Sequence, residues 1–475
     1  MGYMLRKILP FFILFLILAF GSYAQDSLNL KQCISFALEH NTQLLRSKND
    51  LQQASNSYQQ YRANVLPTIN GSATNNFDFG RTIDPATNQF SNQASRTNYF
   101  TLNGDWVIFG GFQKLYQVRQ YEWNKDASAQ SLQKVMDDVS LTIANDYLQI
   151  LLLTEKKGQL ANLVKSSEEN QKKVNILFDA GGTTVAKKYE ADAQLATDQY
   201  NLVDIENQLD KQYLGLKQYM NYDITKPLKI QQINFQGQLF PYNDEDAAKA
   251  INDRVSQLPA VKAARSQRES ALYAWKAIKG TVYPKLSVDA SLHSIYSSQY
   301  QSYSVETLIE PIGILGNDQT KIVYGQVPVA VTSPVGFGDQ LSQNFGQTIG
   351  FTLNVPIFNG LQTKYNIQAA KITYASDDLL LTDAEVKAKN DIYQAYEGMN
   401  AARKKYEAGT LKLKSQEALF KQSEINYNAG AMTFFDYNTA RNNFANAESD
   451  LSQAKYEYIF QTKVFEYYLG KPVSF

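Results

Sequence analysis

The residue types that most often perform chemistry in proteins are scarce in this sequence, which has two histidines and one cysteine. A single cysteine, Cys33, excludes a disulfide framework and a cysteine-rich zinc or iron–sulfur site, and we expect it to pack as a small residue on a helix. His40 and His293 lie far apart, with no second histidine or cysteine at ligand spacing, so we interpret them as solvated. The sequence thus argues against histidine-based acid–base catalysis and against a metal site.

Two further patterns resemble functional motifs but lack essential parts. The run Gly181-Gly182-Thr183-Thr184 is similar to a phosphate-binding loop, but it lacks the Lys-Ser/Thr ending and does not follow a strand. We interpret it as a helix reversal. The acid pairs Asp137-Asp138 and Glu168-Glu169 are expected on solvated helix faces. We therefore predict that the protein is not an enzyme and uses no cofactor.

The composition of the 475 residues argues against two large classes of protein. The 46 Lys and Arg residues balance the 46 Asp and Glu residues, which argues against a nucleic-acid-binding protein. The mean hydropathy of −0.37 argues against a polytopic helical membrane protein. Aromatic residues are nevertheless abundant, with 31 Tyr and 25 Phe. This combination favours transport or structure over catalysis.

The N-terminus has the parts of a secretory signal peptide. Two basic residues, at positions 6 and 7, precede the apolar run Ile8–Phe20, and small residues then lead to Ala24. An N-terminal anchor is the weaker alternative, because this run of 13 residues is shorter than the roughly 20 that span a bilayer. We predict a signal peptide over 1–24 and export of the mature protein. No later segment reaches 18 uncharged apolar residues, so entry into a membrane requires β-strands.

The mature sequence contains two related halves. The segment around Pro67 matches that around Pro284, a shift of 217 residues, and the segment around Phe109 matches that around Phe358, a shift of 249 residues. The second shift persists to the end of the chain, so the halves differ by one insertion of 32 residues. We infer a tandem duplication. Its parts are a first repeat over 25–220, a linker or equatorial segment over 221–245 and a second repeat over 246–475.

Each half has the same predicted order of elements, beginning with a helix and ending with a long helical hairpin. Apolar residues at three- and four-residue steps predict the first helix, from about Leu28 to Ala63 and from about Asp246 to Gly280. The hairpins are predicted over about 111–220 and 360–469. Their first arms contain no proline and hardly a turn signal, which predicts helices of about 100 Å at 1.5 Å per residue.

A pair of strands lies between the helices of each half. Alternation of apolar and polar residues predicts these strands at about 66–109 and 284–358. The strand of the second half is expected to continue through Val355 and Ile357. The polar stretches between paired strands, 80–98 and 297–346, are expected to be loops.

Four strands are too few to close a barrel, and an open sheet edge is not tolerated in lipid. Two copies of the chain would give eight strands, whose interior side chains fill, whereas three copies give twelve, which could leave a lumen. We therefore predict a mixed α and β fold in which the long helices pack side by side with others. Each protomer adds four strands to a trimeric twelve-stranded transmembrane β-barrel.

The hairpin turns and the order of elements resemble the TolC family of outer-membrane efflux proteins over essentially the whole mature chain. At its hairpin turns this family has an aromatic residue followed, at three-residue steps, by Gly, by Ser or Thr, and by an acid. The second half supplies Tyr427, Gly430, Thr433 and Asp436 at these places. The first half supplies Phe178, Gly181 and Thr184, but Lys187 replaces the acid.

This resemblance implies a homotrimer in outer-membrane lipid, whose long coiled-coil helices form an α-helical barrel in the periplasm. It implies docking to a periplasmic adaptor (membrane fusion protein) and, through the adaptor, to an inner-membrane transporter. The implied function is the exit duct of a tripartite efflux or type I secretion system. A coiled-coil scaffolding or adhesion protein without a conduit is the alternative. The exported substrate and the class of pump stay open.

The resemblance also implies two sets of site residues. Exposed backbone and flanking hydroxyls at the hairpin tips are expected to dock the adaptor. These residues are Gly181, Gly182, Thr184, Gly430 and Thr433. Three-fold symmetry would bring three copies of Asp436 around one axis, where like charges repel and attract cations. We therefore predict a pore constriction at Asp436, whereas the role of Lys187 stays open.

Overall fold

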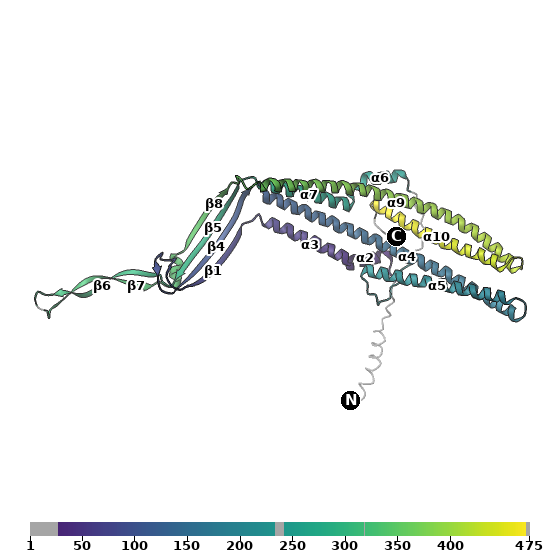
Figure 1. Cartoon of the computed structure of the whole chain (residues 1–475), viewed down its shortest axis with the longest axis horizontal. Helices are drawn as coiled ribbons and strands as arrows, with labels where there is room; N and C mark the ends of the chain where they lie inside the picture. The colour runs from purple at the N-terminus through teal and green to yellow at the C-terminus, as the bar shows by residue number, and fades with distance from the viewer. Residues whose placement is uncertain (1–26, 233–241, 318, 472–475) are drawn as a thin grey trace, which may run out of the picture. The chain divides into compact units, whose positions relative to one another are not determined.

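The computed structural model describes residues 27–232, 242–317 and 319–471 (Figure 1). The predicted signal peptide lies outside the described residues, as does the middle of the predicted linker. Helices make up 65% and strands 19% of the structure. The chain forms two compact units. Of the described residues, those within 27–54, 124–268 and 377–471 belong to a helical unit, and those within 55–123 and 269–376 belong to a sheet unit.

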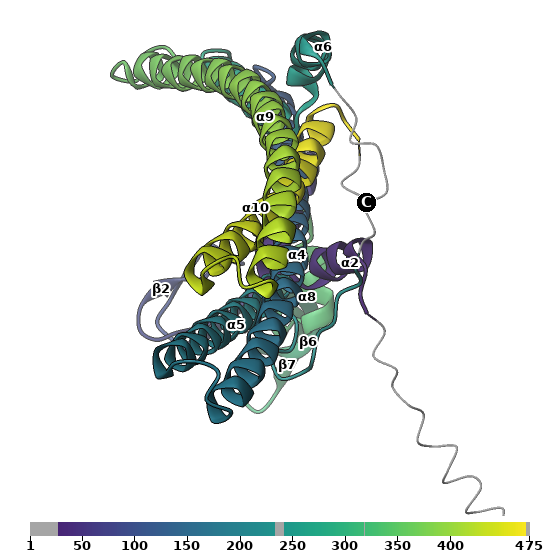
Figure 2. The same ribbon diagram turned by 90° about the vertical axis from the view of Figure 1, so that its right-hand side faces the viewer.

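Two long helical hairpins supply most of the helical unit. Their first arms, α4 (Gln113–Asp179) and α9 (Gln362–Asn428), have 67 residues each. The chain returns beside them as α5 (Val185–Met220) and α10 (Phe434–Tyr468), as Figures 1 and 2 show. Both α4 and α9 start and end 249 residues apart, which is the shift found in the sequence. None of the described helices is both long enough and apolar enough to span a bilayer.

Shorter helices precede each hairpin, and the prediction of one continuous helix in each place is wrong. The first half has α2 (Leu30–His40) and α3 (Thr42–Ala63). Asn41 separates them with an extended backbone, and its side-chain oxygen accepts the N–H groups of Gln43 and Leu44 at 2.9 and 3.1 Å. Asn41 therefore ends one helix and caps the next, as asparagine does well.

The second half has a corresponding break. There α6 (Asp244–Arg254) is followed by a 3₁₀ turn over Val255–Gln257 and then by α7 (Pro259–Gly280). Proline suits the first position of a helix because its missing N–H has no partner there. Pro259 therefore starts a new helix instead of continuing α6.

Two apolar clusters hold the helical unit together at matching positions of the halves. Their central residues are at most 4% exposed: Cys33, Ile143 and Tyr147 in the first cluster, and Ala250, Ile392 and Tyr396 in the second. Cys33 thus packs as a small buried residue, as predicted. Burial raises the pKa of its thiol to about 12, so it is not a reactive thiolate.

The sheet unit is built around four antiparallel strands in the order β1-β4-β5-β8. Their bounds are Thr68–Asp78, Ser95–Gly110, Lys285–Ser297 and Gly346–Asn354. Among the described strands, β1 and β8 have a sheet neighbour on one side only. The sheet therefore has two open edges.

One face of this sheet is apolar and the other is polar. The register aligns Ile69, Gly104, Ala290 and Ile349 across the four strands, whereas the next positions along the strands carry Thr, Asn, Ser and Asp side chains. The apolar side chains are largely uncovered, since Ile69 is 69% exposed and Ile349 is 72% exposed. Apart from the contacts of Phe337 with Phe100 and Tyr296 at one end, the sheet is thus a single layer whose apolar face lacks the cover that a globular core provides.

The stretches predicted as loops contain further strands. Residues 297–346 include a second hairpin, β6 (Gln301–Ile314) and β7 (Ile322–Pro334), and the short helix α8 (Phe337–Gln343). Valines alternate with other residues along β7, a pattern that favours a strand. The stretch 80–98 contains β2 (Thr82–Ile83) and β3 (Phe90–Ser91).

The last strand of the sheet is shorter than the sequence predicts. We expected it to continue through Ile357, but β8 ends at Asn354. Proline has no N–H to donate to a strand neighbour, so Pro356 is unfavourable in a continued strand.

Candidate functional site

The two hairpin turns share one backbone geometry. Gly181 and Gly430 both have a φ of +73°, which glycine adopts without strain. Each donates its N–H to the carbonyl of the aromatic residue three positions earlier, Phe178 at 2.9 Å and Tyr427 at 3.0 Å. A Cβ added to either glycine would meet open space. Both turns are therefore exposed ends of long helices.

A threonine caps the returning helix at each turn. Thr184 accepts the backbone N–H of Lys187 at 3.4 Å, and Thr433 accepts that of Asp436 at 3.2 Å. The Thr433 hydroxyl also donates to the Asp436 carboxylate at 2.6 Å. Asp436 and Lys187 are both exposed, and neither forms an ion pair with any residue that the structure describes. Within its own chain, Asp436 thus belongs to a helix cap.

Large apolar side chains beside both turns are exposed. Ile176 and Tyr189, near the first turn, are 70% and 65% exposed. Ile425 and Phe435, near the second, are 61% and 77% exposed. Apolar side chains that gather at the exposed end of a polar helical hairpin are typical of a protein-binding surface.

A buried ion pair joins the two hairpins away from their turns. Arg441 of α10 and Asp198 of α5 are each 3% exposed, and their side chains meet at 2.7 Å. Arg441 also donates to two groups of α4, the Ser167 hydroxyl at 2.9 Å and the Leu163 carbonyl at 2.8 Å. Ser167 in turn donates to Asp198. Three helices therefore share one polar cluster, whose mutual hydrogen bonds offset the cost of burying both charges.

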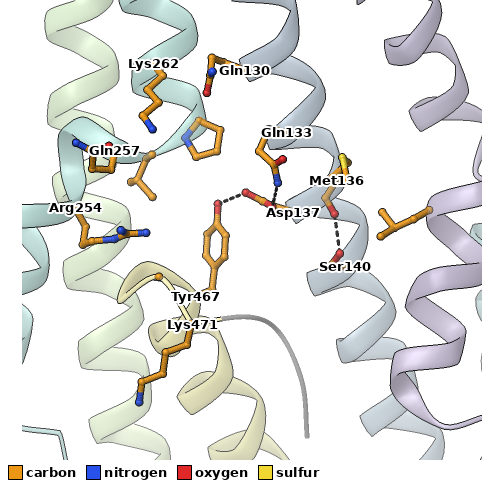
Figure 3. Close-up of a pocket in the computed structure, with 14 residues that line it drawn as sticks. Gln130, Gln133, Met136, Asp137, Ser140, Arg254, Gln257, Lys262, Tyr467 and Lys471 are labelled. Atoms are coloured by element: carbon orange, nitrogen blue, oxygen red, sulfur yellow. Dashed lines mark hydrogen bonds between the residues drawn. The ribbon is translucent and has the colours of Figure 1, made fainter.

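A cavity of about 560 Å³ lies in the helical unit, between α4, the corner from α6 to α7 and the end of α10 (Figure 3). On its α4 side, Asp137 accepts hydrogen bonds from Tyr467 at 2.9 Å and from Gln133 at 2.8 Å. The prediction of a solvated Asp137 is therefore wrong. Burial raises the pKa of its carboxyl above the ordinary value, although both hydrogen bonds oppose this shift.

The two histidines are exposed and do not form a site. His40 stacks on Phe36, with ring centroids 4.1 Å apart, and His293 lies on β5. Across the described ranges, no three His, Cys, Asp or Glu side chains gather closely enough to hold a metal ion.

Comparison with known proteins shows the family. The model of the family described as outer membrane efflux protein matches residues 33–222 and 250–462. This chain belongs to the outer membrane efflux protein family. The resemblance read from the hairpin turns is thus confirmed.

Relatives of this efflux protein cover nearly all of it. Outer membrane protein TolC of Salmonella enteritidis is 21% identical. The alignment has 481 positions, gaps included, and covers 98% of this chain and 86% of TolC. The outer membrane channel CmeC of Campylobacter jejuni is 17% identical, with a TM-score of 0.74 over 93% of this chain and 85% of CmeC. VceC of Vibrio cholerae is 14% identical, with a TM-score of 0.72 over 94% of this chain and 97% of VceC. The structural likenesses show the fold of such channels.

Sequence reasoning found the turns of this efflux protein but missed its buried ion pair. Arg441 and Asp198 are 243 residues apart, and no local pattern links them. One signal was available, because Arg441 is the only charged residue between Asp436 and Glu448. A lone charge in such a segment needs a partner if its helix face is buried.

We expect Asp198→Asn to destabilise the efflux protein, because it leaves the Arg441 charge buried without a counter-charge. The expected cost is about 3–5 kcal/mol. Thermal unfolding of the purified protein, followed by circular dichroism, measures it. Asp204→Asn is the matched control on an exposed turn of α5 and should change stability by less than about 0.5 kcal/mol. Equal unfolding midpoints for Asp198→Asn and the control would show that the pair adds no stability.

Proposed function

We propose that three copies of this efflux protein form an outer-membrane channel, the exit duct of a tripartite efflux or type I secretion system. The observation that carries the proposal is the single-layer sheet, with its uncovered apolar face and its open edges at β1 and β8. In lipid each open edge needs a partner strand. Pairing β1 of one copy with β8 of the next would give twelve strands, enough to enclose a lumen.

The two faces of the sheet suit the two sides of such a barrel. Lipid would cover the apolar face, and the polar face would line water. Asp105 of β4 lies opposite Asp289 of β5 on the polar face. Three copies would place six carboxylates around the lumen, which favours the entry of cations.

The proposal also assigns places and partners to the rest of the chain. The helical part would lie in the periplasm, with a periplasmic adaptor docked at the tip residues and an inner-membrane transporter behind it. The predicted signal peptide over residues 1–24 would direct the chain to export and would then be removed. The equal lengths of α4 and α9, and the two segments matched by the family model, support a tandem duplication. A coiled-coil scaffold without a conduit would have no use for the amphipathic sheet, so the channel is the better supported function.

We expect a charge on the apolar face to block assembly, and a charge on the polar face to be tolerated. Phe351→Lys on β8 should reduce the detergent-stable trimer in outer-membrane fractions, since a lipid-facing lysine costs up to about 4 kcal/mol, depending on its depth. Thr352→Lys, one residue further on and facing the opposite side, is the matched control. It should assemble and shift the ion selectivity measured in planar bilayers. A wild-type protein that purifies as a monomer without conductance would contradict the channel.

Docking of the adaptor at the tips predicts a selective defect in Gly430→Val. Valine at a φ of +73° is strained by about 1–3 kcal/mol, so the turn should change shape. Cross-linking of the tip to the adaptor in whole cells should fall, while the trimer stays in the membrane. Gly158→Val in the middle of α4 meets open space at a helical φ and serves as the control. Undiminished cross-linking in Gly430→Val would place the docking surface elsewhere.

A constriction at Asp436 predicts a salt-dependent effect of Asp436→Asn on conductance. Removing three carboxylates from one axis should weaken block by multivalent cations in planar bilayers. The difference should shrink as added salt screens the charges. Lys187→Gln, at the matching position of the first hairpin, removes a positive charge instead and should not weaken the block. If Asp436→Asn and wild type show the same block at low salt, the constriction lies elsewhere.

A further inference from the structure

The cavity in Figure 3 has the size and lining of a binding site for a small polar molecule. Its volume of about 560 Å³ falls within the range of roughly 300–1,000 Å³ that is usual for ligand sites. Four charged side chains line it: Asp137 of α4, Arg254 at the end of α6, Lys262 in α7 and Lys471 after α10. The balance of charge around the cavity is therefore positive.

Two of these four charges are already engaged within the protein. The hydroxyl of Tyr467 and the side-chain amide of Gln133 both donate to Asp137. Lys471 donates to the Tyr242 hydroxyl at 2.7 Å and lies 3.6 Å from the Glu466 carboxylate. Figure 3 shows Lys471 pointing away from the other two cations.

Arg254 and Lys262 differ from the other two charged residues because their charges are unpaired. Neither side chain has a hydrogen bond or an ion pair with any residue that the structure describes. Both extend into the space between the helices, as Figure 3 shows. Both are partly buried, so bulk water does not fully replace a partner.

The guanidinium of Arg254 packs closely against Gly470. A Cβ added to Gly470, which has a φ of +86°, would lie 2.6 Å from the Arg254 Cζ and 3.0 Å from its Nη1. Only glycine therefore allows the guanidinium to lie in this place. The Nε atom of Arg254 is buried and has no hydrogen-bond partner. The side chain thus lies there without using its full capacity as a donor.

Arg254 does not cap the C-terminal end of α10. Three of the carbonyls near that end, those of Phe465, Glu466 and Tyr467, accept backbone N–H groups at 3.0, 2.9 and 2.8 Å, and Arg254 donates to no carbonyl that the structure describes. The negative end of the helix dipole stabilises a nearby cation, but it supplies no acceptor here. The start of α7 also lies at the cavity, and the positive end of its dipole favours an anion.

We propose that this cavity binds a small oxyanion, a polycarboxylate or a phosphorylated molecule, through Arg254 and Lys262. The planar guanidinium matches the two oxygens of a carboxylate or phosphate, and the ammonium adds a second point of charge. The amide side chains of Gln130 and Gln257 also line the cavity and can donate to further oxygens. The proposal does not depend on the channel function.

Isothermal titration calorimetry on the full chain in detergent tests this proposal, with citrate and inorganic pyrophosphate as probes at constant ionic strength. We expect binding of at least one probe to the wild type, and none of chloride at the same concentration. Citrate alone would indicate a carboxylate ligand, pyrophosphate alone a phosphate ligand, and both a general oxyanion site. Absence of binding by either probe would overturn the proposal.

Variants separate this site from non-specific attraction by surface lysines. Arg254→Gln and Lys262→Gln should each weaken binding at least about tenfold, because each removes a charge-assisted hydrogen bond. Lys249→Gln, on an exposed face of α6, is the matched control and should bind like the wild type. If Arg254→Gln does not fold, Lys262→Gln still decides the question. Equal binding by wild type and Lys262→Gln would refute the site.

Discussion

Hydrogen bonding at the edges of the four-stranded sheet is the constraint on which the proposed assembly depends. Strands β1 and β8 each leave one row of peptide groups without a strand partner among the described residues, and a bilayer offers no water to replace it. One half of the chain supplies a single strand pair, which is marginally stable by itself. Joining β4 to β5 links the two halves into one sheet, and further copies can extend that sheet until it closes. Duplication and oligomerisation are thus two steps toward the same end, a sheet without edges.

The helical unit needs a different kind of stabilisation, because its long helices are polar over most of their surface and bury little apolar area. Tyrosine suits this situation because its ring packs in a core while its hydroxyl reaches a polar group. Tyr147 is fully buried, and its hydroxyl donates to the Gln231 carbonyl at 2.5 Å. Tyr396, at the matching position of the second half, donates to the Asp244 carboxylate at 2.5 Å. These two tyrosines therefore have a structural role that is independent of any binding site.

Features set by neighbouring residues could be predicted from the sequence, whereas features set by distant residues could not. The long helices follow from the absence of proline, the amphipathic strands from period-two alternation, and the turns from Gly181 and Gly430. The pair of Arg441 with Asp198 and the partial burial of Asp137 depend on which helices come together, so no local pattern marks them. The β6–β7 hairpin is an intermediate case, because its valines alternate but the polar composition of the surrounding stretch suggested a loop. The helix break at Asn41 has a local cause, a capping side chain, and could have been read from the sequence.

The two halves also show how a duplicated scaffold can change its chemistry without changing its backbone. Lys187 and Asp436 occupy the same position, the third residue after a capping threonine, and both turns have the same glycine conformation. An acid at this place strengthens the cap, because Thr433 donates to its carboxylate and because the helix N-terminus favours a negative charge. Lys187 makes neither contribution. The first turn still forms, because the Thr184 hydroxyl caps the helix and Gly181 adopts the positive φ. The charge at this position is therefore free to differ between the halves. In the proposed trimer, three acidic and three basic tips would attract one another, whereas six acidic tips would repel.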